Sequence, residues 1–188
     1  MKPLGVDFSE EFVERAREHA GAAGVTDRVG FHVHDMRNLA SFDGSFDLVT
    51  NFWNSLGYYD KETDVEILSE MQRLCSENGT VAIEMSNKEF VVQNYGSSSV
   101  REVDDKLHAE RKQFNLRTGR FETTVDVFAD EGSKYRYLDT LEFEPRIYAP
   151  VELREMCERA GFDEVRLFGG FEGKDLSLDS PRVVVLAW

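Results

Sequence analysis

The feature that most constrains this chain is its beginning, where Gly5-Val6-Asp7-Phe8 runs directly into Ser9-Glu10-Glu11-Phe12. This pattern predicts a short buried strand that ends in a carboxylate and turns at once into a helix, with Ser9 as the N-cap. In open α/β sheets, ligands bind at the carboxyl ends of the strands, and an acid at such an end takes the hydroxyl pair of a ribose. Asp7 stands in that position, so the sequence points to a nucleotide-type ligand.

Composition limits both the architecture and the partners. The 188 residues, with 41% hydrophobic and 12% aromatic content, suit one globular domain with a real core. The 36 acidic residues outnumber 22 basic ones, only 7 of them Lys, which gives a net charge of −14. This charge would repel nucleic acid and anionic membranes, so neither is expected as a partner. Two interpretations of the charge stay open, a halophile-like adaptation to high salt and an ordinary acidic protein.

Targeting signals and cysteines favour a cytoplasmic protein. The sequence has no apolar run near the length of about 20 residues that spans a bilayer. The first residues, Met1-Lys2-Pro3-Leu4, are not followed by the apolar segment of a signal peptide. Cys75 and Cys157 both fall on apolar faces of predicted helices, where reduced core cysteines are the simplest interpretation.

The first half of the chain alternates strands and helices. Helices are predicted after Ser9 and after Asp60, the second of them ending at Asn78-Gly79. The predicted strands are Leu4–Asp7, a segment of alternating residues from Val29 that ends at Asp35, Phe46–Asn51 and Thr80–Met85. This order predicts an α/β fold with a doubly wound, mostly parallel sheet.

The second half begins with a different pattern. Leu107–Pro145 reads as a three-stranded antiparallel β insertion within a single domain, serving either as a lid over the site or as a dimer surface. A helix from Pro150 to Gly161 follows. Phe162–Leu167 and Val183–Trp188 are predicted as the last two strands.

Several segments in this order resemble one family, the class I S-adenosylmethionine-dependent methyltransferases. The residues that carry the resemblance are Gly5–Ser9, Asp35-Met36, Phe46–Val49 and Asn78–Thr80. The ending resembles the small-molecule branch, which has an antiparallel β insertion before the last helix, through Ile147-Tyr148, Glu152-Leu153, Ala160–Phe162 and Asp179–Arg182. The resemblance implies a Rossmann-like methyltransferase fold, S-adenosyl-L-methionine as cofactor and a small-molecule substrate.

The resemblance also implies roles at the cofactor site. Asp7 would bind the ribose hydroxyls and Phe8 would pack on adenine. Asp35 would take the adenine amino group, and Met36 would cover the adenine edge. From the residues alone, Asp7 could be a plain turn acid, and Phe8 and Met36 could be simple core residues.

On the acceptor side, the resemblance implies that Asn51, Phe52 and Trp53 lie where the methionyl part and the methyl acceptor meet. Tyr58, Arg146 and Tyr148 are further candidates for binding the substrate. Arg146 and Arg182 are equally compatible with surface ion pairs. No catalytic residue is assigned, and the candidates for a general base, by residue type only, are Tyr58, Tyr148, His108 and Glu84. No metal is expected, because His32 and His34 have too few potential ligands beside them.

One element of the family pattern is not found in these 188 residues. The acid that binds the ribose normally follows a glycine-rich strand–loop–helix by about 20 residues. A start-site error, a fragment, a partner chain that supplies the strand, and a degenerate interaction module without catalysis are the alternatives. If the lost loop is decisive, this chain by itself is expected to bind the cofactor weakly or not at all.

Overall fold

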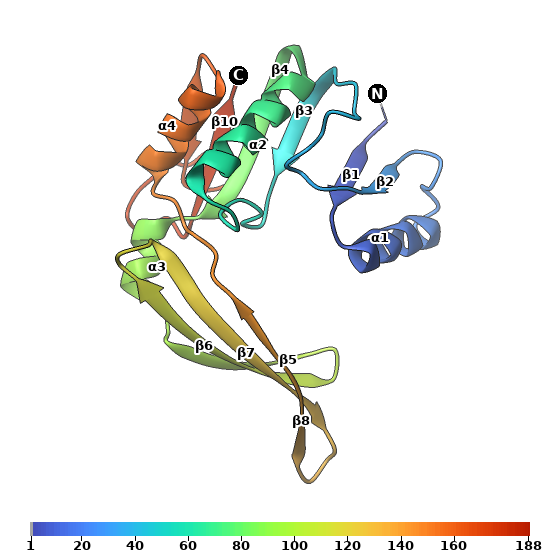
Figure 1. Cartoon of the computed structure of the whole chain (residues 1–188), viewed down its shortest axis with the longest axis vertical. Coiled ribbons are helices and arrows are strands. Elements are labelled where there is room, and N and C mark those ends of the chain that lie inside the picture. The colour runs from blue at the N-terminus through green and yellow to red at the C-terminus, as the bar shows by residue number, and fades with distance from the viewer. Residues whose placement is uncertain (1) are drawn as a thin grey trace.

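The computed structural model describes residues 2–188, and its N-terminal part is a small unit of its own (Figure 1). It contains β1 (Leu4–Asp7), α1 (Glu10–Ala22) and β2 (Gly30–Val33). Ser9 caps α1 as predicted, because its side chain accepts a hydrogen bond from the Phe12 N–H at 3.3 Å. β1 and β2 pair in parallel, with Asp7 opposite Val33.

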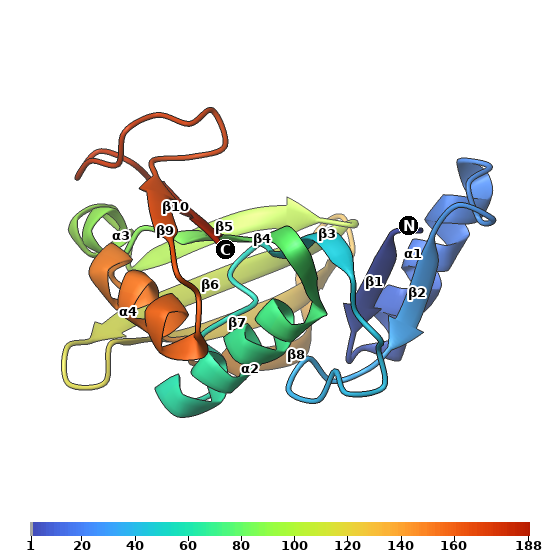
Figure 2. The ribbon, with the colours of Figure 1, turned by 90° about the horizontal axis from the view of Figure 1, so that it is seen from above.

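The main body is a four-stranded mixed sheet in the order β3-β4-β10-β9. Its strands are β3 (Phe46–Asn51), β4 (Cys75–Ser86), β9 (Val165–Phe168) and β10 (Arg182–Ala187). Two helices, α2 (Lys61–Leu74) and α4 (Pro150–Ala160), lie side by side on one face of this sheet (Figure 2). Their apolar stripes meet the sheet in one buried core, whose fully buried members include Leu68, Ile83, Leu153, Met156 and Val185.

The α/β class predicted from the sequence is confirmed, and the main sheet is mixed rather than mostly parallel. β3 and β4 run parallel, but β10 is antiparallel to both β4 and β9. The N-terminal pair β1-β2 forms a separate sheet, because β1 and β3 are not hydrogen-bonded to each other within residues 2–188. The helix α2 also ends earlier than predicted, at Leu74, because Cys75 already pairs with Phe46 as the start of β4.

The β insertion has four strands, because the three antiparallel strands predicted within Leu107–Pro145 are preceded by one that was not predicted. The strands are β5 (Ser98–Val103), β6 (Lys106–Asn115), β7 (Arg120–Asp130) and β8 (Tyr135–Phe143), and α3 (Lys88–Asn94) precedes them. β5 was missed because all six of its residues are exposed, which removes the hydrophobic alternation. Its hairpin turn is Asp104-Asp105, whose φ angles of 48° and 59° suit a two-residue turn between antiparallel strands.

The insertion projects from the main body as a long twisted sheet (Figure 1). Its outer strand β8 is exposed at every residue except the half-buried Thr140. Whether the insertion acts as a lid or as a dimer surface stays a prediction. Within the part of the chain that the structure describes, no helix has the length and apolar character that crossing a membrane requires.

Gly57 joins the base of the insertion to the loop after β3. Its carbonyl accepts a hydrogen bond from the Arg146 N–H at 2.8 Å, and the Arg120 guanidinium donates to the same carbonyl at 3.4 Å. The φ of Gly57 is +97°, and a Cβ here would lie 2.1 Å from the Arg146 carbonyl oxygen. Only glycine fits this backbone contact without a shift.

We expect Gly57→Ala to lower the free energy of unfolding by about 3 kcal/mol, because left-handed strain and overpacking add together. Gly24→Ala is the matched control, since Gly24 has a φ of +67° but nothing within 4 Å of its added Cβ. It should cost about 1 kcal/mol. Urea denaturation of both variants measures the difference, and equal losses would contradict the close contact.

Candidate functional site

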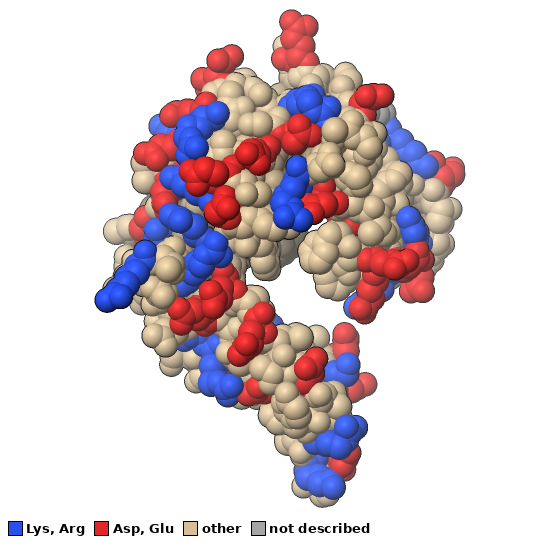
Figure 3. Space-filling model, viewed as in Figure 1, with Lys and Arg blue, Asp and Glu red and all other residues tan. Residues whose placement is uncertain are grey.

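A broad cavity of about 740 Å³ lies between the N-terminal unit and the main body. Figure 3 shows a notch between the N-terminal unit and the β insertion, whereas the residues that line the cavity belong to the N-terminal unit, the segment after it, β3 with its following loop, and α2. The carboxyl ends of β1, β2 and β3 all open into the cavity, as expected for ligand sites in parallel sheets. Leu4, Val6, Leu48, Ile67 and Met71 supply much of its apolar wall.

The parallel pairing of β1 and β2 brings Asp7 and Asp35 to the same edge of the sheet. Asp7 is the last residue of β1 and pairs with Val33, the last residue of β2. Asp35 lies two residues beyond Val33. Both line the cavity together with Phe8, whose ring is exposed. Asp7 Oδ1 accepts a hydrogen bond from the Ser9 N–H at 2.8 Å, which fixes the carboxylate at the start of α1.

Asp35 is held by Arg37. The Arg37 Nε donates to both carboxylate oxygens, at 3.0 and 2.9 Å, and its backbone N–H donates to Oδ1 at 2.9 Å. These hydrogen bonds lower the pKa of Asp35. The Arg37 guanidinium also lies 4.6 Å from the ring centroid of Tyr59. Arg37 therefore contacts both Asp35, just after β2, and the loop after β3.

Asn51 and Met36 meet where the two units face each other. The Asn51 amide donates to the Met36 sulfur at 3.8 Å. The Asn51 Oδ1 is buried at the cavity wall with no partner in the described structure. A buried polar atom without a partner is costly, so this oxygen is suited to accept a hydrogen bond from a bound ligand. The predicted cofactor residues Asp7, Phe8, Asp35, Met36, Asn51 and Phe52 therefore all line one cavity.

The predicted substrate residues divide into two groups. Trp53 and Tyr58 line the same cavity and are exposed at 80% and 55%. Arg146 and Tyr148 are not among its lining residues. The Arg146 guanidinium donates to Glu152 at 3.1 Å. Tyr148 is fully buried and donates its hydroxyl to Asp64 at 2.6 Å.

Asp64 was not singled out from the sequence, where it reads as an ordinary acid in the first turn of α2. It is completely buried, and it accepts hydrogen bonds from the Tyr148 hydroxyl and, at 3.0 Å, from the Gly57 N–H. Burial raises the pKa of Asp64. Burial and this carboxylate also raise the pKa of Tyr148, which makes its phenol a poor general base.

The remaining polar candidates are engaged elsewhere. Glu84 is buried and bonds to the Trp53 backbone and to Arg182. His32 and His34 pack edge-on against the Phe42 ring, at centroid distances of 5.4 and 5.3 Å. Among residues 2–188, no cluster of three or more His, Cys, Asp or Glu side chains is arranged to hold a metal ion. His108 lies on β6 in the insertion. No catalytic residue is assigned.

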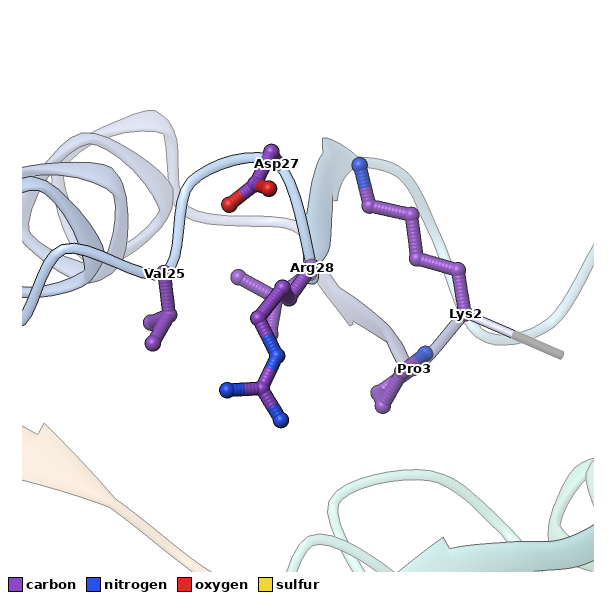
Figure 4. A pocket seen from close by; sticks show the side chains of 6 residues that line it. Lys2, Pro3, Val25, Asp27 and Arg28 are labelled. Carbon is purple, nitrogen blue, oxygen red and sulfur yellow. The ribbon is translucent and has the colours of Figure 1, made fainter.

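A second hollow, of about 510 Å³, lies at the opposite, amino ends of β1 and β2. Figure 4 shows its side chains, with Lys2 and Pro3 before β1 and Val25, Asp27 and Arg28 before β2. Its lining residues do not include the two acids at the carboxyl ends of these strands. Substitutions of its lining residues can therefore serve as controls for substitutions at the carboxyl ends of the same two strands.

The sequence and the fold both match methyltransferases. Residues 1–79 match the family model described as a methyltransferase domain. The chain is 25% identical over 184 residues to "Putative methyltransferase YqeM" of Bacillus subtilis (strain 168), a match that covers 95% of this chain and 72% of that protein.

Two solved structures share the fold along the whole chain. A S-adenosylmethionine-dependent methyltransferase from Clostridium acetobutylicum ATCC 824 superposes with a TM-score of 0.84 at 17% identity, over 100% of this chain and 74% of that one. The CcbJ methyltransferase from Streptomyces caelestis gives a TM-score of 0.83 at 19% identity, over 100% of this chain and 79% of that one.

The α/β fold brings Asp7 and Asp35 to one cavity at the carboxyl ends of neighbouring strands. Residues 1–79 match a methyltransferase domain in sequence, and the chain has the fold of S-adenosylmethionine-dependent methyltransferases along its whole length. The resemblance drawn from the sequence is thereby confirmed.

The raised pKa of Asp64 predicts a pH-dependent stability. A raised folded-state pKa favours folding below the unfolded-state value, near 4, and this stabilisation is lost as pH rises. Asp64→Asn keeps an oxygen acceptor but does not ionise. Its stability relative to the native chain should therefore increase as pH rises above about 4.

Asp60→Asn is the control for this effect. Asp60 caps the same helix, and its hydrogen bond from the Thr63 N–H, at 2.8 Å, lowers its pKa, so its variant should show the opposite trend. Urea denaturation between pH 3 and 8 measures both, because the difference for Asp60→Asn changes mainly below about pH 4. If the stability of Asp64→Asn relative to the native chain stays constant or falls as pH rises, the raised pKa of Asp64 is contradicted.

Proposed function

We propose that this chain holds S-adenosyl-L-methionine in the cavity at the carboxyl ends of β1, β2 and β3, for methyl transfer to a small-molecule acceptor. The observation that carries this proposal is the meeting of Asp7, Asp35 and the unpartnered Asn51 Oδ1 around one cavity. When bound, the cofactor supplies a methyl group on a sulfonium, which is transferred by in-line displacement. The residues therefore have to bind, orient and exclude water.

The two acids and their neighbours suit the nucleoside part. The Asp7 carboxylate, anchored by the Ser9 N–H, faces the cavity as an acceptor for the ribose hydroxyls. The exposed Phe8 ring beside it offers a flat apolar face to adenine. Asp35, fixed by Arg37, would accept from the adenine amino group, with Met36 at the adenine edge.

The loop after β3 suits the reacting end. Asn51 would accept a hydrogen bond from the cationic methionyl amine through Oδ1. Phe52, Trp53 and Tyr58 line the same cavity and offer aromatic faces, which favour a neighbouring sulfonium or other cation. The wide opening toward solvent supports a small-molecule acceptor that enters from outside.

The separation of the two sheets supports a weak cofactor site in the 188 residues alone. β1 and β3 face each other across the cavity without backbone pairing, and no glycine-rich strand–loop–helix is present in these residues to bind the methionyl end. The lack of pairing between β1 and β3 and the lack of a glycine-rich segment in these residues also support the alternative function, an interaction module without catalysis.

Calorimetry with S-adenosylhomocysteine tests this proposal. We expect the 188-residue chain to bind more weakly than micromolar. A protein extended at its N-terminus by a strand–glycine-loop–helix of about 30 residues, the size of one βαβ element, should gain binding. Micromolar or tighter binding by the chain alone would contradict the weak site. No binding by a folded extended protein would favour the interaction module.

In the extended protein, Asp7→Asn should weaken S-adenosylhomocysteine binding about 10- to 100-fold, because hydrogen bonds to a charged group contribute about 1.5–3 kcal/mol. Asp27→Asn is the matched control at the opposite end of the same unit and should leave the affinity within about twofold. Equal effects of the two changes would exclude the carboxyl edge as the ribose site.

A further inference from the structure

The backbone takes an unusual path directly after β3. Trp53 and Asn54 both have left-handed conformations, with φ angles of 63° and 58°. Consecutive non-glycine residues with such angles are uncommon, and they persist only where surrounding contacts enforce them. Strained backbone of this kind is concentrated at functional sites, and here it lies at the edge of the cavity.

The contacts that enforce this path come from the ends of β4 and β10. The buried Glu84 accepts a hydrogen bond from the Trp53 N–H at 2.9 Å, and the Asn54 N–H donates to the Glu84 carbonyl at 3.4 Å. The Asn54 Oδ1 accepts from the Ser86 N–H at 2.6 Å. Glu84 is itself paired with the Arg182 guanidinium, which also donates to the Ser86 hydroxyl at 3.0 Å.

These contacts hold the Trp53 indole in a position where the protein does not bury it. Trp53 is 80% exposed at the cavity, while Arg182 stands 5.9 Å from its ring centroid. Neighbouring Phe52 packs edge-on against Phe171 at 5.3 Å and extends the aromatic surface. Both the left-handed backbone and the exposed ring are unfavourable for the free protein, so their combination points to a ligand.

We propose that Trp53 is a stacking platform for a methyl acceptor that contains a flat ring, and that Glu84 and Asn54 are the positioning residues that aim it. With Arg182 over one face of the indole, the other face is left for the ligand. The ring of the acceptor can be aromatic or a sugar, because an aromatic ring and the C–H face of a pyranose both offer an apolar surface that stacks on an indole. This inference rests on the proposed function, since it names the acceptor class for the same cavity.

Ring binding is tested by ligand-observed NMR on the 188-residue chain. The probes are phenol and D-glucosamine, with open-chain sorbitol as the control. We expect at least one ring probe to bind, to lose at least fivefold in affinity with Trp53→Ala, and to lose less than twofold with Trp53→Phe. Binding by phenol alone or by D-glucosamine alone identifies the kind of ring. Unchanged binding to Trp53→Ala, equal binding of sorbitol, or no ring binding would overturn the platform.

The positioning role is tested by the fluorescence of Trp53 in a Trp188→Phe background, which leaves Trp53 as the single tryptophan. Glu84→Gln and Asn54→Ala should each shift the emission and weaken ring binding about threefold. Asn54→Gly, which relieves the left-handed strain, should bind better than Asn54→Ala. Asp27→Asn is the control, since Asp27 lies at the opposite end of the N-terminal unit and makes none of these contacts.

The outcomes separate this inference from the proposed function. If Glu84→Gln proves too unstable by thermal unfolding, the pair of Asn54 variants still tests the positioning. If every variant has the same emission and the same ring binding as Asp27→Asn, the positioning role is overturned. Calorimetry with S-adenosylhomocysteine on the extended protein runs in parallel. If ring probes bind but S-adenosylhomocysteine does not, only the proposed cofactor site is rejected. If S-adenosylhomocysteine binds but ring probes do not, only the role of Trp53 as a stacking platform is rejected.

Discussion

The buried carboxylate of Asp64 is the interaction on which the arrangement around the cavity depends. From α2, it accepts hydrogen bonds from the Gly57 N–H in the loop after β3 and from the Tyr148 hydroxyl before α4. Gly57 in turn bonds to Arg146 and Arg120 at the base of the insertion. A buried acid is costly unless it is hydrogen-bonded, so these partners have to stay together in the folded state. One carboxylate thereby fixes the aromatic loop relative to the insertion.

A second connection sets the opposite wall of the cavity. The segment between β2 and β3 is held on α2 by Arg73, whose guanidinium donates to the Leu39 and Phe42 carbonyls at 2.8 and 3.3 Å. Arg37 on the same segment stacks on Tyr59. The N-terminal unit is therefore positioned through its connecting segment, while its strand β1 remains unpaired with β3. This explains how Asp7 and Asp35 can face Asn51 without sharing a sheet with it.

The parts of this fold that follow from local sequence were predictable. The strands Leu4–Asp7 and Phe46–Asn51 match the structure at both ends. A capped helix follows the first strand, and a mostly apolar segment forms the second, although Leu48 in it is 55% exposed. The grouping of Asp7, Asp35 and Asn51 followed from the rule that parallel strands end at one edge. β5 was not predictable, since an exposed hairpin strand has no apolar periodicity. The pairing of Asp64 with Tyr148 was not predictable, because it joins residues 84 positions apart and no local pattern records it. The left-handed Trp53-Asn54 pair likewise depends on Glu84, from another strand.

The exposed outer strand of the insertion has a consequence for the behaviour of the protein in solution. β8 carries Tyr135, Tyr137, Leu141 and Phe143 on a sheet edge, a surface that invites pairing with another chain. Arg136, Asp139 and Glu142 are interspersed among them, and charged residues on an edge strand oppose such pairing. The net charge of −14 adds a long-range repulsion between copies, which salt screens over about 10 Å at 0.1 M. Low ionic strength is therefore expected to oppose pairing of two copies through this edge, and high ionic strength to weaken that opposition.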